Sequence, residues 1–508
     1  MKERYVLALD QGTTSSRAIL FDHAARPVSV GQSPLRRFYP QAGWVEQDAN
    51  EIWSSQWQAI EQCLQEAKCD TSEIAAIGIA NQRETTVVWD RRTGKPLYNA
   101  IVWQCRRTAP YCTELKESGL EAVFRQKTGL RLDPYFSGTK IAWLLNTVSG
   151  LRDMAERGEV AVGTVDSWLM YLLSGQRRHL TDVSNAARTL LYNIHTLRWD
   201  DELLQLLNVP EAVLPRVVDS SGAAVWTSPQ LLGKAIPISG IAGDQQAALF
   251  GNGCFDAGSA KNTYGTGCFL LMNTGDVPVN SAHGLISTVA WRLNGRVQYA
   301  LEGSIFIAGA LVQWLRDGLQ IIPSVEETER LALSVADTGG VVIVPAFAGL
   351  GSPYWDSSAR GLIIGLTQGT TREHIVRAAL EAIAHQTADV VEAINHDHPE
   401  PLTRLRTDGN AIRNRFLAQF QADILGIPVV RPLISETTAL GAAFLAGLGV
   451  GFWDNLGQIA QMVQTNDVFY PRLDEAGRHA HRQQWQAAVV RAGGWHRPRQ
   501  GGDASCDL

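Results

Sequence analysis

The chain has 508 residues, which is too many for one compact core, so we expect two or more domains. Its composition, 45% hydrophobic and 19% charged, is that of a soluble globular protein. The formal net charge of −6 argues against a general nucleic-acid or anionic-membrane binder, because phosphate affinity of that kind needs a basic surface. The seven cysteines show no CxxC pair and no zinc-like spacing, and no stretch has the length of a membrane span. We therefore expect a cytoplasmic protein with reduced thiols and no stable membrane insertion.

The first predicted elements are two apolar strands, residues 5–10 and 17–22, joined by a short polar turn. The turn region gathers an acid, a glycine and four hydroxyl side chains ahead of Arg17: Asp10, Gly12, Thr13, Thr14, Ser15 and Ser16. One interpretation is a polar turn whose hydroxyls cap backbone groups. The other is a phosphate clamp, in which backbone N–H groups, hydroxyls and Arg17 surround phosphate oxygens while Asp10 holds a Mg²⁺-bound water. The local pattern leaves both open, and the absence of a GxxxxGK[ST] sequence excludes a P-loop.

A helix over 49–67 and strands over 74–82 and 85–90 come next, and this alternation favours an α/β fold. Arg83 and Glu84 lie side by side between the two strands. Adjacent opposite charges are usually solvated surface, and the pair alone indicates no more. Trp103 and Tyr135 follow, and such aromatic residues more often belong to a core than to a ligand site.

Residues 240–252, GIAGDQQAALFGN, place Asp244 where a strand turns into a helix. The common use of an aspartate there is as a helix N-cap. The alternative is a carboxylate that accepts a proton from a substrate hydroxyl, and the local pattern favours the cap.

The opening hairpin has a weak echo at 262–273, NTYGTGCFLLMN, about half a chain later. A boundary within 250–257 would give each half one such hairpin, so we divide the chain into domains 1–252 and 253–508. The second half continues with a strand and glycine-rich loop over 339–356 and a long helix over 372–394. Residues 405–420 then read as a strand, an Asp-Gly-Asn turn and a helix, which is a weak signal for a nucleotide site.

Together these motifs resemble the glycerol kinases, which are FGGY carbohydrate kinases of the actin/hexokinase-like superfamily. The resemblance runs from about residue 4 to about residue 495 and is carried most specifically by LALDQGTTSSRAILFD, NQRETT, IVWQCRR, GDQQAAL and NTYGTGCFLLMN. It implies an α/β protein with two ribonuclease H-like (actin/hexokinase-type) domains around a central cleft. It also implies ATP- and Mg²⁺-dependent phosphorylation of glycerol to sn-glycerol 3-phosphate, in glycerol uptake and catabolism, by a homo-oligomer, either a dimer or a tetramer.

The resemblance also implies roles for individual residues. Glycerol would contact Arg83, Glu84, Trp103, Tyr135, Asp244, Gln245 and Phe269, and Asp244 would be the general base. The nucleotide would contact Thr13, Thr14, Ser15, Arg17, Thr266, Gly309, Gln313, Asn410 and Asn414. Asp10 and, through water, Asp244 would hold Mg²⁺.

Two positions depart from the family pattern. The adenosine turn, normally Asp-Gly-Gly, reads Asp408-Gly409-Asn410. Asparagine tolerates the positive φ that the second glycine can adopt, so we expect nucleotide binding to persist but to be weakened by crowding from the Asn410 side chain. Residues 228–240 lack the glycine- and arginine-containing loop that binds fructose 1,6-bisphosphate in many bacterial glycerol kinases. We therefore expect weak or absent inhibition by that compound.

The sequence also allows three alternative functions. An FGGY kinase acting on another small polyol or ketose is the nearest one, and the glycerol-contact set argues against it. An actin-like filament or chaperone ATPase would need no acceptor pocket. A catalytically dead homologue is disfavoured because Asp10, Arg17, Arg83 and Asp244 are all present.

Overall fold

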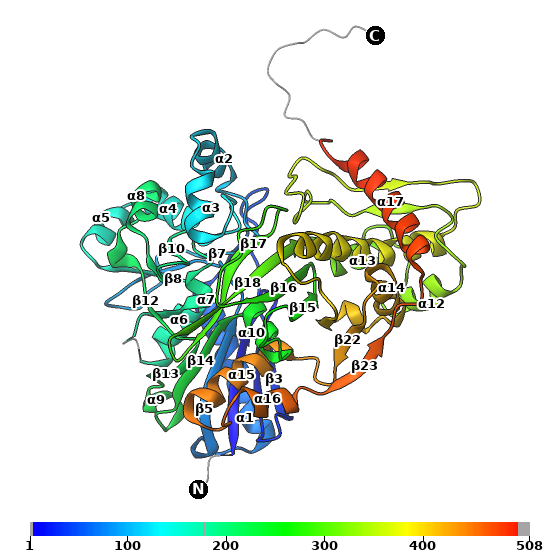
Figure 1. Cartoon of the computed structure of the whole chain (residues 1–508). Helices are drawn as coiled ribbons and strands as arrows, with labels where there is room; N and C mark the ends of the chain where they lie inside the picture. The colour runs from blue at the N-terminus through cyan, green and yellow to red at the C-terminus, as the bar shows by residue number, and fades with distance from the viewer. Residues whose placement is uncertain (1–3, 176–177, 496–508) are drawn as a thin grey trace.

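The computed structural model describes residues 4–175 and 178–495. A mixed sheet of 13 strands runs through the molecule in the order β23-β22-β21-β15-β16-β18-β17-β13-β14-β5-β1-β2-β3 (Figure 1). The same arrangement of five strands occurs twice in this order, once from each half of the chain.

The first set is built around the opening hairpin. β1 pairs antiparallel with β2, which pairs antiparallel with β3, while β1 is parallel to β5 and β5 is parallel to β14. The bounds are β1 Tyr5–Gln11, β2 Ser15–Phe21, β3 Pro27–Pro34, β5 Ile74–Asn81 and β14 Pro237–Gly243, with β13 Ser221–Trp226 beyond β14.

The second set repeats the pattern. β15 and β16 form the antiparallel hairpin, β16 pairs antiparallel with β18, and β15, β21 and β22 are parallel neighbours. The bounds are β15 Ala260–Tyr264, β16 Cys268–Gly275, β18 Arg296–Ile305, β21 Leu405–Asp408 and β22 Val429–Pro432, with β17 Ile286–Leu293 and β23 Thr465–Phe469 at the two sides. Among the described residues the two sets meet through one backbone pair, Ser221 with Leu293. The predicted similarity between residues 262–273 and the first hairpin is therefore confirmed, because both hairpins belong to sets of strands with the same topology.

Two helices, each following the last parallel strand of its set, pack against each other between the halves. These are α10 Asp244–Gly251 after β14 and α15 Thr437–Val450 after β22. Their backbones touch at glycines: a Cβ atom on Gly441 would lie 1.8 Å from the carbonyl oxygen of Ala247. α15 also lies on the first sheet, where a Cβ on Gly78 would lie 2.1 Å from the carbonyl oxygen of Ala442. Such close approach of backbones is possible only without side chains at these positions.

The outer helices follow the predicted apolar periodicity. α1 spans Ala49–Ala67, as predicted, and packs beside β2 and β3. α13 spans Arg372–Asp397, which extends the predicted helix by three residues and buries Ala378, Ala379, Ala382, Ile383 and Gln386, while Ile375 is only half-buried. The remaining helices of the second half are α11 Gly309–Asp317, α12 Glu327–Leu333, α14 Arg415–Leu425, α16 Leu456–Met462 and α17 Glu475–Ala492.

Residues between β5 and β14 add a group of helices on the left side of Figure 1. Its helices are α2 Ala109–Glu117, α3 Glu121–Thr128, α4 Ser137–Thr147, α5 Leu151–Glu156, α6 Val165–Leu173, α7 Val183–Ala186, α8 Asp201–Leu207 and α9 Pro229–Leu232. Short strands connect them or form small separate sheets: β6 Val87–Asp90, β7 Ala100–Ile101, β8 Val160–Gly163, β9 Leu180–Asp182, β10 Tyr192–Asn193, β11 Arg198–Trp199 and β12 Arg216–Val218. Three further two- or three-residue strands are β4 Glu46–Gln47, β19 Val342–Val344 and β20 Leu362–Ile364.

The structure confirms the predicted fold class, an α/β protein whose two halves share one topology. The domain boundary at residue 252 stays a prediction. None of the helices in the described part of the chain combines the length and apolar character needed to cross a membrane.

Candidate active site

The turn of the first hairpin is short and tightly held. Gly12 donates its backbone N–H to the Ser15 carbonyl at 3.0 Å, and the β1–β2 register places Asp10 opposite Arg17. Thr14 is exposed, and Gly12, Thr13 and Ser15 are half-buried. The turn therefore presents backbone and hydroxyl groups rather than burying them.

A layer of amide side chains holds this turn from behind. Gln82 Nε2 donates to the Gly12 carbonyl (3.2 Å) and to Gln47 Oε1 (2.9 Å), while Gln47 Nε2 donates to the Thr13 carbonyl (2.8 Å). Trp103 Nε1 donates to the Thr13 hydroxyl at 2.9 Å. These contacts fix the conformation of the turn. They also link the turn to the segment after β5, where Arg83 follows Gln82.

The second hairpin turn meets the start of α11. Gly309 N–H donates to the Gly265 carbonyl (3.0 Å) and Ala310 N–H to the Thr266 carbonyl (3.1 Å). A Cβ atom on Gly309 would lie 2.6 Å from that Gly265 oxygen, so the contact requires a glycine. The structure thus brings together Thr266 and Gly309, two residues that the resemblance assigned to the nucleotide site. Thr266 is exposed.

Arg83 and Glu84 are buried, with 3% and 1% of their surfaces exposed. The interpretation of this pair as solvated surface was therefore wrong. Glu84 adopts a positive φ of 59°, which a non-glycine residue rarely does, and this strain is common at functional sites. The local sequence hides the reason, because the partners of both side chains come from distant segments.

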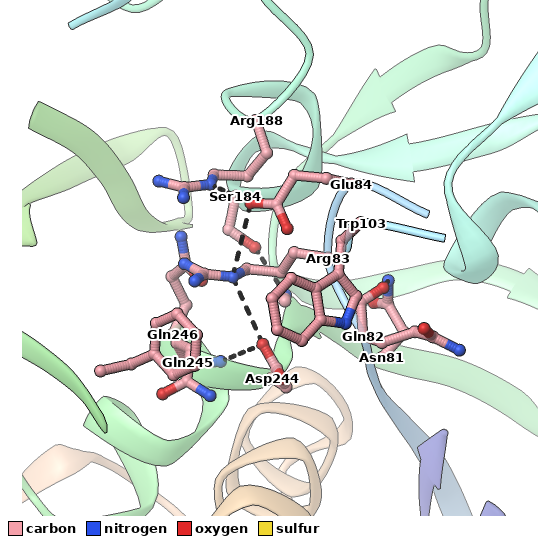
Figure 2. Close-up of polar contacts among 12 residues, drawn as sticks. Asn81, Gln82, Arg83, Glu84, Trp103, Ser184, Arg188, Asp244, Gln245 and Gln246 are labelled. Carbon is pink, nitrogen blue, oxygen red and sulfur yellow. Dashed lines mark hydrogen bonds and ion pairs between the residues drawn. The ribbon is translucent and has the colours of Figure 1, made fainter. Parts of the chain in front are cut away.

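Those partners are Arg188 and Glu302, neither of which was identified from the sequence. Glu302 accepts hydrogen bonds from Arg83 Nη1 (2.7 Å) and Nη2 (2.9 Å). Arg188 Nε donates to Glu84 at 2.6 Å (Figure 2). Arg188 also pairs with Glu302 at 3.1 Å. The four buried side chains balance two positive and two negative charges, which is the condition for keeping ions inside a protein.

Asp244 lies at the edge of this cluster. It is the first residue of α10, while the N-cap is Gly243, and its carboxylate accepts from the Gln245 N–H at 2.7 Å. Arg83 Nε lies 3.3 Å from Asp244 Oδ1, and the side chain is 30% exposed (Figure 2). Burial raises the pKa of Asp244, and the Arg83 and Lys261 charges oppose the rise. The position is therefore more than a helix cap: it presents a partly exposed carboxylate beside a fixed guanidinium.

Lys261, on β15, is a third residue that sequence reasoning missed. It is buried, and its ammonium donates to Gln245 Oε1 (2.5 Å), the Thr263 hydroxyl (2.8 Å) and the Phe269 carbonyl (3.2 Å). Burial lowers its pKa to about 8. Lys261 therefore positions Gln245 and adds positive charge next to Asp244 from the second half of the chain.

Aromatic rings close the other side of the site. The Trp103 ring makes edge contacts with Tyr135 (centroids 5.7 Å apart) and Phe269 (6.1 Å). The Tyr135 hydroxyl accepts from Arg83 Nη2 at 3.1 Å, and the Arg83 guanidinium lies 5.8 Å from the Phe269 ring centroid. All seven residues predicted to contact the acceptor are thus brought to one place.

Asp10 and Arg17 lie between the turn and α15. Burial raises the pKa of Asp10 to about 7; Arg17 lowers it, while Glu436 and Asp244 raise it further. Arg17 forms an ion pair with Glu436, the residue just before α15, through one of its terminal nitrogens. Asp10 therefore shares a charged region with Asp244, and Glu436 is a fourth residue missed from the sequence.

The residues predicted for the adenosine end come from α11 and from the segment that joins β21 to α14, and a Cβ atom on Gly309 would lie 4.0 Å from the Cβ atom of Ala411. Gln313 is exposed on α11, and Asn414 caps α14 by accepting from the Leu417 N–H at 2.9 Å. Asn410 is exposed, and its φ is −75°, so the positive φ considered for this position does not occur. The positive φ of the turn, 91°, falls on Gly409, where a Cβ would lie 2.5 Å from the Tyr264 carbonyl oxygen. Crowding of a nucleotide by Asn410 stays a prediction.

Comparison with known families covers most of the chain. The N-terminal domain of the FGGY family of carbohydrate kinases matches residues 5–251, and the C-terminal domain of the same family matches residues 260–450. The chain belongs to the FGGY family of carbohydrate kinases. Similar curated proteins include glycerol kinase 2 of Thermotoga maritima, 59% identical over 97% of this chain and all of that protein. The glycerol kinase of Carboxydothermus hydrogenoformans is 58% identical over 97% of this chain and 99% of its own length.

Solved structures agree with this family. The crystal structure of Plasmodium falciparum glycerol kinase with ADP has a TM-score of 0.90 and 36% identity, covering 97% of this chain and 98% of that one. Gluconate kinase from Lactobacillus acidophilus has a TM-score of 0.85 at 22% identity, with 96% and 97% coverage, and shares the fold. The resemblance stated from the sequence is confirmed.

Proposed function

We propose that this FGGY kinase is a glycerol kinase, which transfers the γ-phosphoryl group of ATP to glycerol to form sn-glycerol 3-phosphate. The observation that carries the proposal is the arrangement around Asp244, where Arg83, Gln245 and a wall of aromatic rings surround one partly exposed carboxylate. The glycerol kinases that are 58–59% identical over nearly the whole chain support the same activity.

The pocket chemistry fits a small triol. Glycerol presents hydroxyls along one edge and C–H groups along the other. Four polar side chains can form hydrogen bonds with the hydroxyls: Arg83, Glu84, Asp244 and Gln245. The rings of Trp103 and Phe269 cover the carbon edge. A site that hydrogen-bonds each hydroxyl disfavours an analogue lacking one, because its own buried polar groups would be left unpaired.

Asp244 orients the attacking hydroxyl and takes its proton as the new oxygen–phosphorus bond forms and ADP leaves. Burial raises the pKa of this carboxyl group, which makes it a stronger base, while the nearby Arg83 and Lys261 charges favour its ionised form. Phosphoryl transfer asks a protein mainly for positioning and charge stabilisation. Asp244 and the fixed guanidinium of Arg83 supply both at the acceptor.

The two hairpin turns hold the nucleotide phosphates. Thr13, Thr14, Ser15 and Arg17 act from the first turn, and Thr266 acts from the second. Each five-strand set has such a turn within its hairpin, β1–β2 in the first set and β15–β16 in the second, and this repetition supports phosphate binding from both halves. Gly309, Gln313, Asn410 and Asn414 line the adenosine end of the site.

The donor set also fits Mg²⁺, which prefers carboxylate and water oxygens. Asp10 is a carboxylate whose pKa is raised by burial and by neighbouring acids, so a bound cation would relieve an unfavourable charge. Asp10, with Asp244 through water, would hold the ion, and Mg²⁺ bound there neutralises charge on the phosphates. We further propose a cytoplasmic homo-oligomer acting in glycerol uptake and catabolism.

A substrate panel tests the proposal. ADP formation from Mg·ATP is measured with no acceptor, with glycerol, and with erythritol or dihydroxyacetone. We expect the highest kcat/KM with glycerol and little turnover without acceptor. A higher kcat/KM with another polyol or ketose would reassign the substrate, and acceptor-independent hydrolysis at the same rate would indicate an ATPase instead.

A further inference from the structure

A second cluster of titratable side chains lies away from the reaction, where α13 and α17 pack together. Glu381 and His385 are four residues apart on α13 and so share one face of that helix. His481 comes from α17, which lies beside α13 at the right of Figure 1. One potential ligand atom from each of the three lies within 4.8 Å of the other two.

These side chains line a small cavity. A cavity of about 10 Å³ is bounded by Glu381, His385 and His481, together with Trp485 and Thr338 among others. A volume of this order accommodates one water-sized particle, and no more. The cavity therefore has room for a single ion between the three polar groups.

His385 is buried, yet its Nδ1 atom has no hydrogen-bond partner among the described residues. The ring is held in place by stacking on Trp485, with centroids 5.2 Å apart and planes 6° apart, and by the edge of Phe420. A buried polar atom without a partner is costly and uncommon.

Charge at the cluster is balanced rather than strongly acidic. Glu381 Oε1 accepts from Arg377 Nε at 2.8 Å, and this is the one hydrogen bond recorded for its carboxylate within the described chain. On the α17 side, Arg482 forms an ion pair with Asp389. One carboxylate oxygen and two imidazole rings thus remain for an additional ligand.

We propose that Glu381, His385 and His481 form a binding site for one divalent transition-metal ion, with Zn²⁺ as the favoured ion, that ties α17 to α13. Two imidazole nitrogens and one carboxylate oxygen are a donor set typical of Zn²⁺ and unsuited to Mg²⁺. Water would complete a tetrahedral shell. Ligand atoms of such a shell lie about 3.3 Å apart, so the side chains must move inward, and the half-buried His481 is the one with most freedom to do so.

The test uses the full chain, stripped of metal with a chelator and then dialysed. Binding of Zn²⁺ alone is measured by calorimetry, and binding of Co²⁺ by its visible absorption, in the wild type and in His481→Gln. His479→Gln is the matched control, because His479 lies two residues earlier on the same helix and is exposed. His481 is also partly exposed, so its replacement should leave the fold intact; thermal unfolding of the metal-free proteins checks this.

We expect one tight site per chain and a Co²⁺ spectrum typical of four ligands in the wild type and in His479→Gln. His481→Gln should bind at least about tenfold more weakly and lose that spectrum. The metal should also raise the unfolding temperature of the wild type but not that of His481→Gln. Unchanged tight binding in His481→Gln would place the metal elsewhere, for example at Asp10 and Asp244, and would overturn the proposal. Absence of a tight site in the wild type would do the same and would indicate a buried water in the cavity.

Discussion

At the scale of single residues, Arg83 connects the acceptor site to a buried charge cluster contributed by both halves of the chain. Glu302 accepts two hydrogen bonds from Arg83 and lies 3.1 Å from Arg188. Removing one member of a buried ionic cluster leaves an uncompensated charge, which costs far more than losing an exposed pair. We therefore expect the acceptor site to depend on Glu302 as well as on the residues proposed to contact glycerol.

Glu302→Gln should lower the free energy of unfolding by about 3–5 kcal/mol. The reason is that Arg83 and Arg188 would be left with Glu84 as the one fully buried carboxylate between them. Chemical denaturation measures this. Glu327→Gln is the control: Glu327 forms an exposed pair with Arg330, and its loss should cost less than about 1 kcal/mol. Equal effects of the two substitutions would show that the buried cluster carries no special stability.

Asp10 gives the site a dependence on pH. Burial raises the pKa of its carboxyl group to about 7, so below that pH the group holds a proton that a cation must displace. The apparent affinity for Mn²⁺, used as a probe for Mg²⁺, should fall up to about tenfold per pH unit below pH 7 and level off above it. Titrations between pH 5.5 and 8 would measure it. Asp10→Asn should bind weakly with a much flatter pH profile, and the wild-type slope in this variant would assign the proton to another group.

At the scale of elements, the first hairpin is connected to α15 by the ion pair between Arg17 and Glu436. Arg17 uses one terminal nitrogen for this pair, which leaves the rest of its planar guanidinium for a phosphate. Glu436 thus positions an arginine of the first half from a helix that belongs to the second half.

Glu436→Gln should raise the KM for ATP about three- to tenfold, because a charge-assisted bond that orients Arg17 is replaced by a weaker one. The KM for glycerol should change little. Steady-state kinetics with each substrate varied in turn would separate the two effects. A lower KM for ATP would show instead that Glu436 competes with the phosphates for Arg17.

Sequence periodicity was sufficient to predict most elements that position the site. The opening hairpin, the helix at 49–67, the long helix at 372–394 and the repeated hairpin at 262–273 were all read from apolar patterns and turn residues. Local sequence failed where the deciding contact was distant. Arg83 and Glu84 read as surface because Arg188 and Glu302 lie more than 100 and 200 residues further along the chain, and the positive φ of the adenosine turn fell on Gly409 rather than on Asn410.

At the scale of the whole molecule, the two halves share one topology, and α10 and α15 join them through close backbone contacts at glycines. We propose that the reactants bind between the halves. The acceptor residues come mainly from the first half, while Thr266, Gly309 and Lys261 come from the second. Movement of one half relative to the other would therefore change the distance between the acceptor and the phosphates. The assignment of residues 1–252 and 253–508 to two domains remains a prediction.

The segment 228–240, which is partly exposed before β14 begins, bears on regulation. It forms α9 and the start of β14 and contains no arginine, whereas tight binding of a bisphosphate favours guanidinium groups. Fructose 1,6-bisphosphate should therefore leave the rate of glycerol phosphorylation unchanged within about twofold. Strong inhibition at low concentration in the kinase assay would show that another surface binds it.

The central claim, that Asp244 serves as the base for phosphoryl transfer to glycerol, is tested most directly by Asp244→Asn. The substitution preserves shape and removes the proton acceptor, so glycerol-dependent ADP formation should fall by about 10²–10⁴-fold while the unfolding temperature and ATP binding stay near those of the wild type. Activity at the wild-type level in Asp244→Asn would contradict the account.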